Sequence, residues 1–151
     1  MTVQFKQKVY DQFQQLINEK ISLIRHTLGE LKESGANETK STAGDKHETA
    51  LAMLQIEQEN ARKQLKEALE QKALFDTVDI TVEAKRISKG SLVKTSKGWL
   101  FMSVALGKIV VDGTLVIALS PQSPLGKKLV GLPPSGIAEV NGVTYIVEEL
   151  I

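Results

Sequence analysis

The stretch "LAMLQIEQENARKQLKEALEQKALF", residues 51–75, repeats mostly apolar or small residues at alternating steps of three and four. The series comprises Leu51, Leu54, Gln58, Ala61, Leu65, Ala68, Lys72 and Phe75. Such steps place all of these residues on one stripe of a helix, in the heptad pattern of a coiled-coil seam. A helix of this kind cannot bury its seam alone, so the stretch predicts a long amphipathic helix that needs a partner.

The partner helix is found upstream in the same chain. Phe13, Ile17, Ile21, Ile24, Leu28 and Leu31 recur at steps of three and four, and no proline occurs before Pro121. A polar segment at about residues 35–48 separates the two patterns. Amphipathic helices joined by a short polar loop pair antiparallel. Residues 1–76 are therefore predicted to form an antiparallel coiled-coil hairpin, with helices of roughly 28 residues each and an acidic tip.

The periodicity changes after Asp76. Partly alternating apolar runs flank Ser96-Lys97-Gly98, Asp112-Gly113 and Asn141-Gly142, which are turn signals of β-hairpins. Between the second and third of these lies "SPLGKKLVG", in which Ser123 can cap a short helix, Pro124 suits its first position and Gly131 can end it. Residues 77–151 are expected to form a small antiparallel sheet with one short helix, which makes the fold class α+β.

Composition excludes several classes of function. The chain has 151 residues, no cysteine and 5 % aromatic residues, which rules out thiol chemistry and argues against a large aromatic-lined ligand pocket. No Gly-rich phosphate loop, nucleophile elbow or His-Glu-x-x-His motif occurs, and no apolar run suits a membrane span. We therefore expect a cytoplasmic protein without an active site, a cofactor or a small-molecule ligand of its own, and without a membrane partner.

The charges are distributed unevenly along the chain. Residues 85–128 contain a single acid, Asp112, and eight basic residues: Lys85, Arg86, Lys89, Lys94, Lys97, Lys108, Lys127 and Lys128. A basic tract can meet nucleic acid or an acidic protein surface. A solvated lysine-rich surface explains it equally well, so this tract does not decide the function.

Asp45 and Glu48 at the expected tip have two compatible interpretations. Asp-x-x-Glu is a capping box, with Asp45 as the N-cap and Glu48 at the third helical position. Two carboxylates at this spacing can also share a hard cation such as Mg²⁺, which prefers oxygen ligands, provided that a partner completes the coordination. An ordered cap would hold the same carboxylates ready for the cation.

Two motifs resemble those of the bacterial Gre-type transcript cleavage factors. "GDKHETA", residues 44–50, is similar to the family's Gly-Asp-Leu-x-Glu-Asn-Ala at the hairpin tip, and "SPQSPLGKKLVG", residues 120–131, is similar to its Ser-Pro-x-x-x-x-Leu-x-Gly stretch. The motifs occur in the family's order and at family-like spacing, and the resemblance covers the chain from about Glu30 onward.

The resemblance implies a fold and a mechanism. The C-terminal domain would be FKBP-like and would dock on core RNA polymerase beside its secondary channel. The docking residues would come from the segment with Ser123, Pro124, Leu125, Gly126, Lys127 and Gly131. The hairpin would enter the channel, where Asp45 and Glu48 would help to hold the second Mg²⁺ that drives hydrolysis of the backtracked RNA 3′ end. The active site and the shared Mg²⁺ would belong to the polymerase.

The tip departs from the family pattern at two positions, and it also carries the extra polar residues "ANETKSTA" between the first helix and Gly44. Thr49 stands where the family has asparagine, and Ala52 stands where it has tyrosine. The resemblance is therefore also compatible with a secondary-channel modulator that does not stimulate cleavage. An FKBP-like prolyl isomerase and a coiled-coil adaptor are further alternatives of other classes.

Overall fold

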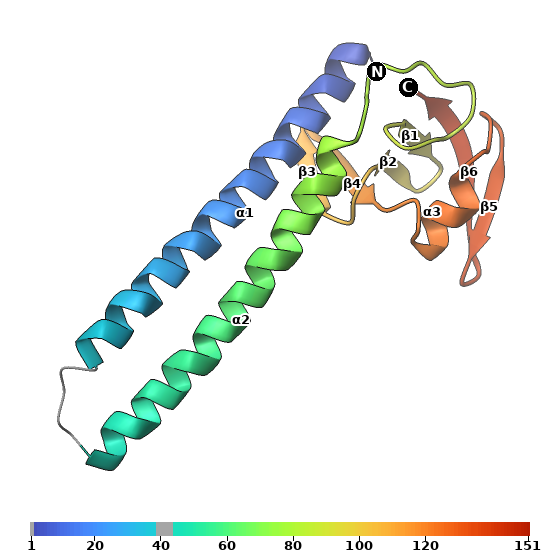
Figure 1. Cartoon of the computed structure of the whole chain (residues 1–151). Coiled ribbons are helices and arrows are strands. Elements are labelled where there is room, and N and C mark those ends of the chain that lie inside the picture. Colours follow the sequence, from blue (N-terminus) through green and yellow to red (C-terminus); the bar gives the residue numbers. More distant parts are fainter. Residues whose placement is uncertain (1, 39–43) are drawn as a thin grey trace. The chain divides into compact units, whose positions relative to one another are not determined.

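The computed structural model describes residues 2–38 and 44–151, and for residues 37, 38 and 44–47 the backbone alone (Figure 1). Two long helices, α1 (Val3–Glu38) and α2 (Gly44–Asp76), precede six strands and a short helix. The strands are β1 (Leu92–Thr95), β2 (Gly98–Met102), β3 (Gly107–Val111), β4 (Thr114–Leu119), β5 (Ile137–Val140) and β6 (Val143–Leu150), and α3 (Pro124–Leu129) lies between β4 and β5. The α+β class is thus confirmed, and the long helices, of 36 and 33 residues, exceed the predicted length.

The chain divides into two compact units. The hairpin unit consists of residues 17–72, and the sheet unit combines residues 1–16 with residues 73–151. The expected boundary between residues 76 and 77 differs from this division, because the first turns of α1 and the last turn of α2 belong with the sheet. The physical reason is a set of aromatic contacts between these turns and the strands.

The seam of the hairpin unit follows the predicted heptads. Ile17, Ile21 and Ile24 of α1 and Ala61 and Ala68 of α2 are buried. The other predicted positions of this unit (Leu28, Leu31, Leu51, Leu54, Gln58, Leu65 and Lys72) are half-buried. Apolar residues outside the series, such as Leu23 and Ile56, are exposed. Buried and half-buried positions thus follow the predicted series and exposed apolar residues lie outside it, as expected for a coiled-coil seam.

The six strands form one mixed sheet in the order β3-β4-β2-β1-β6-β5. Four of the five strand pairs are antiparallel, but β2 and β4 are parallel, with Phe101 opposite Ala118. The prediction of a wholly antiparallel sheet is therefore wrong. The β3–β4 hairpin places β4, rather than β3, beside β2. Because β3 lies between β2 and β4 in the sequence, β2 and β4 run in the same direction.

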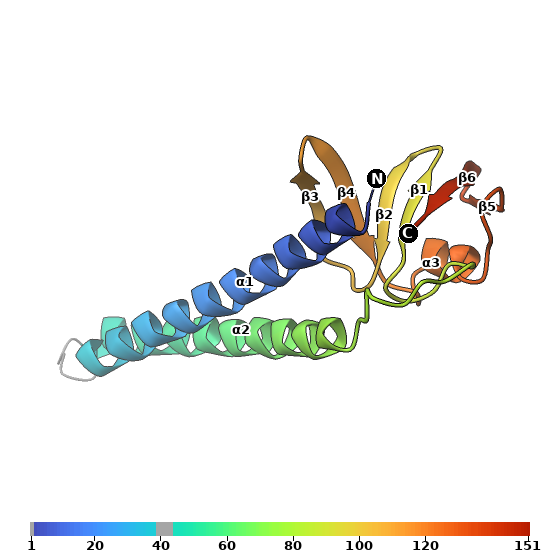
Figure 2. The same ribbon diagram turned by 90° about the horizontal axis from the view of Figure 1, so that it is seen from above.

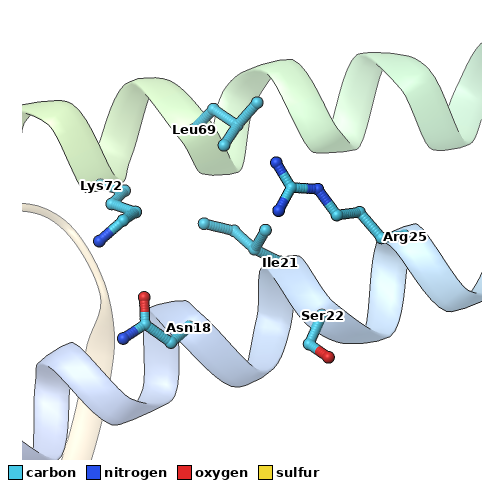
Figure 3. Close-up of a pocket in the computed structure, with 6 residues that line it drawn as sticks. All are labelled: Asn18, Ile21, Ser22, Arg25, Leu69 and Lys72. Carbon is cyan, nitrogen blue, oxygen red and sulfur yellow. The ribbon is translucent and has the colours of Figure 1, made fainter.

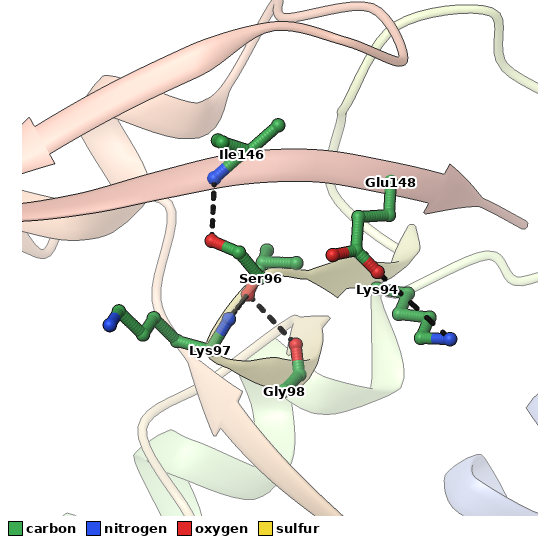
Figure 4. A network of polar contacts seen from close by, with 7 residues as sticks. Lys94, Ser96, Lys97, Gly98, Ile146 and Glu148 are labelled. Atoms are coloured by element: carbon green, nitrogen blue, oxygen red, sulfur yellow. Dashed lines mark hydrogen bonds and ion pairs between the residues drawn. The ribbon is translucent and has the colours of Figure 1, made fainter.

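A polar network fixes the junction between β1 and β6, where the register shifts between Lys94 and Thr95 (Figure 4). The Ile146 amide donates to Ser96 Oγ at 3.0 Å, and the Ser96 amide donates to the Ile146 carbonyl at 2.9 Å. Thr95 Oγ1 donates to the Gly98 carbonyl at 2.9 Å. These bonds satisfy the backbone groups that the irregular register leaves out of the ladder.

Helical side chains pack on both faces of the sheet, and α3 lies toward β5 and away from β3 (Figure 2). On one face Phe5 packs edge-on against Trp99, Phe13 stacks on Phe101, and Phe75 meets Phe101 edge-on, with ring centroids 5.7, 5.9 and 6.3 Å apart. On the other face Leu129 of α3 joins a core cluster that comprises Ile87, Val93, Leu100, Met102, Leu119, Ala138 and Val147. Trp99 and Phe101, which lie two residues apart on β2, are thus both buried on the first of these faces.

Candidate functional site

The two acids of the tip motif lie in the first turn of α2. This helix begins at Gly44, so the backbone of Asp45 and of Glu48 is helical. Residues three positions apart on a helix are neighbours on one face. Glu48 is exposed. The side chain of Asp45 and residues 39–43 lie outside the described residues, so the predicted metal-ligating arrangement rests on the backbone spacing.

The interpretation of Asp45 as the N-cap stays a prediction, because its side chain lies outside the described residues. Gly44, which precedes Asp45, is already part of α2. Because glycine has no Cβ atom, Gly44 can be either the last loop residue or the first helical residue. The sequence therefore does not determine at which residue α2 begins. A position in the first turn still favours carboxylates, because the partial positive charge of the helix dipole lies there.

A groove between the two helices of the hairpin unit has a basic residue on each side (Figure 3). Its volume is about 280 Å³, and Asn18, Ile21, Ser22, Arg25, Leu69 and Lys72 line it. A second groove nearer the tip, of about 450 Å³, includes Lys32 of α1 and Arg62 of α2 together with Glu59. Each groove thus has one cation from each helix, an arrangement that suits phosphate oxygens.

Ser123 caps α3 as predicted. Its Oγ accepts a hydrogen bond from the Gly126 amide at 3.0 Å and donates one to the Ser120 carbonyl at 2.7 Å. Pro124 occupies the first helical position, and Gly131 follows the helix with φ = 89°, a left-handed conformation that favours glycine. These bonds tie the segment from Ser120 to Gly126 into one rigid turn.

The six predicted docking residues differ in their surroundings. Pro124, Lys127 and Gly131 are exposed and can meet a partner, and Leu125 is half-buried against the core cluster. Ser123 is engaged in the cap, and Gly126 is buried. The motif therefore determines the shape of the α3 turn as well as its surface contacts. Lys128 and Val130, which are not among the predicted docking residues, are also exposed beside this turn.

Gly126→Ala should destabilise the sheet unit, because a Cβ atom there would lie 2.0 Å from the Ser120 carbonyl oxygen. Overpacking of a close site costs about 1–3 kcal/mol. Gly29→Ala is the matched control: nothing lies within 4 Å of a Cβ atom at this helical position, and alanine is favoured there by about 1 kcal/mol. Thermal unfolding should lower the midpoint for the first variant and raise it for the second. Equal midpoints would show that the α3 turn tolerates a side chain.

An exposed apolar strip on β3 and β4 was not predicted from the sequence. Val110, Leu115 and Ile117 are 59, 48 and 40 % exposed, and the register pairs Val110 with Leu115 and Lys108 with Ile117 on the same sheet face as α3. The run "KIVVDGTLVIAL" favours two buried strands by its apolarity. The sequence does not reveal that these side chains are exposed, because their exposure depends on α3. This helix covers only the other end of the same sheet face.

Part of the basic tract serves internal contacts. Arg86 Nη1 donates to the Gly131 carbonyl at 3.1 Å, Lys89 donates to Thr77 Oγ1, and Lys94 Nζ lies 4.0 Å from a carboxylate oxygen of Glu148. Lys97, Lys108, Lys127 and Lys128 are exposed. The tract is thus divided between structural contacts and the surface.

Comparison of the chain with protein-family models, with curated proteins and with solved structures gives no match. Among the residues that the structure describes, no helix has the length and apolarity needed to cross a membrane. Nor does any group of three or more His, Asp or Glu residues that could hold a metal ion occur within the described residues.

Proposed function

We propose that the protein is a transcription elongation factor that binds bacterial RNA polymerase through the secondary channel and assists cleavage of backtracked RNA. The observation that carries this proposal is the position of Asp45 and Glu48 in the first turn of α2, next to the turn of a long helical hairpin. A carboxylate pair presented in this way can supply part of the coordination of a second Mg²⁺. The polymerase would supply the remaining ligands and the reacting groups.

The chemistry would be metal-assisted hydrolysis of a phosphodiester bond. A second cation near the scissile phosphate activates a water molecule and stabilises the oxygen that leaves. Asp45 and Glu48 would ligate this cation together with polymerase side chains, and the hairpin would position them. The protein itself would therefore act as a cleavage-assisting factor rather than as an enzyme.

The grooves of the hairpin unit support a nucleic-acid partner. Arg25 and Lys72 flank the first groove, and Lys32 and Arg62 flank the second. Basic side chains attract the RNA backbone independently of its sequence. The backtracked RNA 3′ end would lie close to the tip in the proposed complex, so Lys32 and Arg62 of the groove nearer the tip would add to its binding.

The sheet unit would supply the docking surface. Pro124, Lys127 and Gly131 are exposed around α3, and the apolar strip of Val110, Leu115 and Ile117 lies on the same face of the sheet. An exposed apolar patch beside polar residues favours a protein-interaction site, and exposed lysines complement an acidic partner surface. An FKBP-like fold of this domain is part of the proposal.

A secondary-channel modulator without cleavage activity is the second candidate. Thr49 and Ala52, which replace the family's asparagine and tyrosine, are both exposed on α2 near the tip. A prolyl isomerase is less well supported, because Trp99 and Phe101 are buried against Phe5 and Phe13. A coiled-coil adaptor would leave the motif around α3 without a role.

The proposal predicts that the tip reaches the polymerase active centre. The chain has no cysteine, so Ser34→Cys near the tip and Thr144→Cys on β6, both exposed positions, can each carry a single iron-chelate cleavage reagent. In complexes with core RNA polymerase, the label at position 34 should cut the polymerase around its catalytic Mg²⁺, and the label at position 144 should cut only the outer surface. Binding without cuts near the catalytic centre from position 34 would exclude insertion into the channel.

A further inference from the structure

The strand β3 lies at one end of the sheet and has a free edge. It pairs with β4, and within residues 2–38 and 44–151 no strand pairs with its other side (Figure 2). The strand at the opposite end, β5, differs because α3 packs against it. An edge strand presents N–H and C=O groups that are available to an added strand. The free edge of β3 is therefore a candidate interaction surface.

The β3–β4 hairpin determines which backbone groups of β3 point outward. Its turn, Asp112-Gly113, has φ values of 49° and 78°, as in a two-residue type I′ turn. The residues that flank such a turn, Val111 and Thr114, form a hydrogen-bonded pair. Hydrogen-bonded pairs alternate with non-hydrogen-bonded pairs along an antiparallel ladder. Lys108 and Val110 belong to pairs of the second kind, so their N–H and C=O groups point away from β4.

The sequence of β3 does little to prevent pairing at this edge. Proteins protect edge strands with proline, with β-bulges or with charged side chains. β3 contains no proline, and its register with β4 is unbroken from Gly107 to Val111. Val110, whose backbone groups point outward, has an exposed side chain opposite the exposed Leu115. The charge of Lys108 is therefore the one protective feature of these three that the strand has.

The charge of Lys108 selects the kind of strand that can pair with β3. Lys108 is the only charged residue of β3 and β4, and within the described part of the chain its exposed side chain forms no ion pair. Asp112 in the adjacent turn is engaged by Lys8 at 2.8 Å. A second copy of β3 that overlaps fully with the first would bring its own Lys108 close to this one, and like charges on neighbouring strands are destabilising. The charge thus disfavours self-association and favours a strand with an acidic residue.

We propose that β3 binds an extended acidic segment of another protein, which joins the six-stranded sheet as a further antiparallel strand. The backbone of this segment exchanges hydrogen bonds with the outward-pointing N–H and C=O groups of Lys108 and Val110, as in other cases of strand addition. Side chains two residues apart share one face of a sheet. The segment therefore has an acidic residue beside Lys108 and, two positions earlier, an apolar residue beside Val110. This inference goes beyond the proposed function, because it does not require the polymerase.

The test is a titration of the full-length, ¹⁵N-labelled protein with the peptide acetyl-Thr-Val-Thr-Glu-Thr-amide, followed by amide NMR shifts. Saturable shifts are expected at residues 107–111, with a Kd on the order of 1 mM. The same peptide with lysine in place of glutamate should bind roughly tenfold more weakly, because it places a like charge beside Lys108. Shifts that do not saturate, saturable shifts confined to other residues, or equal affinities for the two peptides would overturn the proposal. Because the titration contains no polymerase, its outcome is separate from that of the tests of the proposed function.

Two substitutions on β3 and one control test the contact residues. Val110→Pro removes an outward-pointing N–H group, at a position where an edge strand accepts proline, and should weaken binding of the glutamate peptide roughly tenfold or more. Lys108→Glu should reverse the preference, so that the lysine peptide binds more tightly than the glutamate peptide. Lys128→Glu makes the same change of charge on α3, which packs against the strand at the opposite end of the sheet, and should leave the preference unaltered.

The exposed position of Lys108 keeps the test decisive if Val110→Pro fails to fold. A folded Val110→Pro chain that binds the glutamate peptide as the unmodified chain does would show that the edge of β3 is not the site. An unchanged preference after Lys108→Glu would show that this lysine does not select the acidic residue. An equal reversal by Lys128→Glu would assign the preference to the net charge of the protein and not to β3.

Discussion

Replacing Asp45 with asparagine and Glu48 with glutamine together is expected to abolish stimulated cleavage of backtracked RNA while binding to the polymerase remains. The amide side chains keep the size of the carboxylates and are compatible with a helical first turn. Their neutral oxygens are much weaker ligands for Mg²⁺ than carboxylates are. The measurement is the rate of RNA cleavage in a stalled, backtracked elongation complex across a Mg²⁺ titration, with polymerase affinity determined in parallel.

The outcomes of this experiment separate the proposed roles. A purely structural role of the two acids in the first turn of α2 predicts a small loss of stability and an unchanged cleavage rate for the variant. If the unmodified chain binds the polymerase but stimulates no cleavage at any Mg²⁺ concentration, the protein is the modulator of the second candidate function. Restoring asparagine at Thr49 and tyrosine at Ala52 would then test whether these two positions account for the lost activity.

Phe13→Ala is expected to destabilise the chain by about 3–5 kcal/mol, the usual cost of removing a buried phenylalanine. Phe13 is fully buried and stacks on Phe101 at 5.9 Å between ring centroids. The contact joins α1 to the sheet, so the loss should affect the strands as well as the helix. Chemical denaturation should therefore show the same shift by helical circular dichroism and by the fluorescence of the single tryptophan, Trp99.

Leu23→Ala serves as the control for Phe13→Ala. Leu23 lies on the same helix and is 67 % exposed, so its replacement should change the stability by less than about 0.5 kcal/mol. A Phe13→Ala variant whose helical signal shifts while the Trp99 transition stays in place would show that α1 does not stabilise the sheet. In that case the unit boundary at residues 76 and 77 expected from the sequence would describe the folding units better.

The Phe13 contact also bears on a sheet domain produced alone. A fragment beginning near Asp79 lacks Phe5, Phe13 and Phe75, and it would expose the buried rings of Trp99 and Phe101 to water. A fragment of this kind would have an apolar face that favours aggregation. Experiments on the docking surface are therefore best done with the full chain or with hairpin substitutions.

Local patterns in the sequence determined the helical part of the chain. Heptad steps from Leu51 to Phe75 and from Phe13 to Leu31 identified the positions that are buried or half-buried in the seam. Ser123 and Pro124 identified the start of α3, and Asp112-Gly113 and Asn141-Gly142 identified two turns, in which both Asp112 and Asn141 have positive φ. These features are predictable because helix periodicity, caps and tight turns depend on residues within a few positions of one another.

Only the tertiary structure decided which distant segments meet. The parallel pairing of β2 with β4, the packing of the first turns of α1 on the sheet and the exposure of Val110, Leu115 and Ile117 all depend on contacts far apart in the sequence. Lys6 illustrates the point: in the sequence it is one lysine near a helix start, whereas in the structure its side chain is only 3 % exposed. Hydrophobic burial depends on area rather than direction, so the sequence pattern states that an apolar face must be covered but does not state which segment covers it.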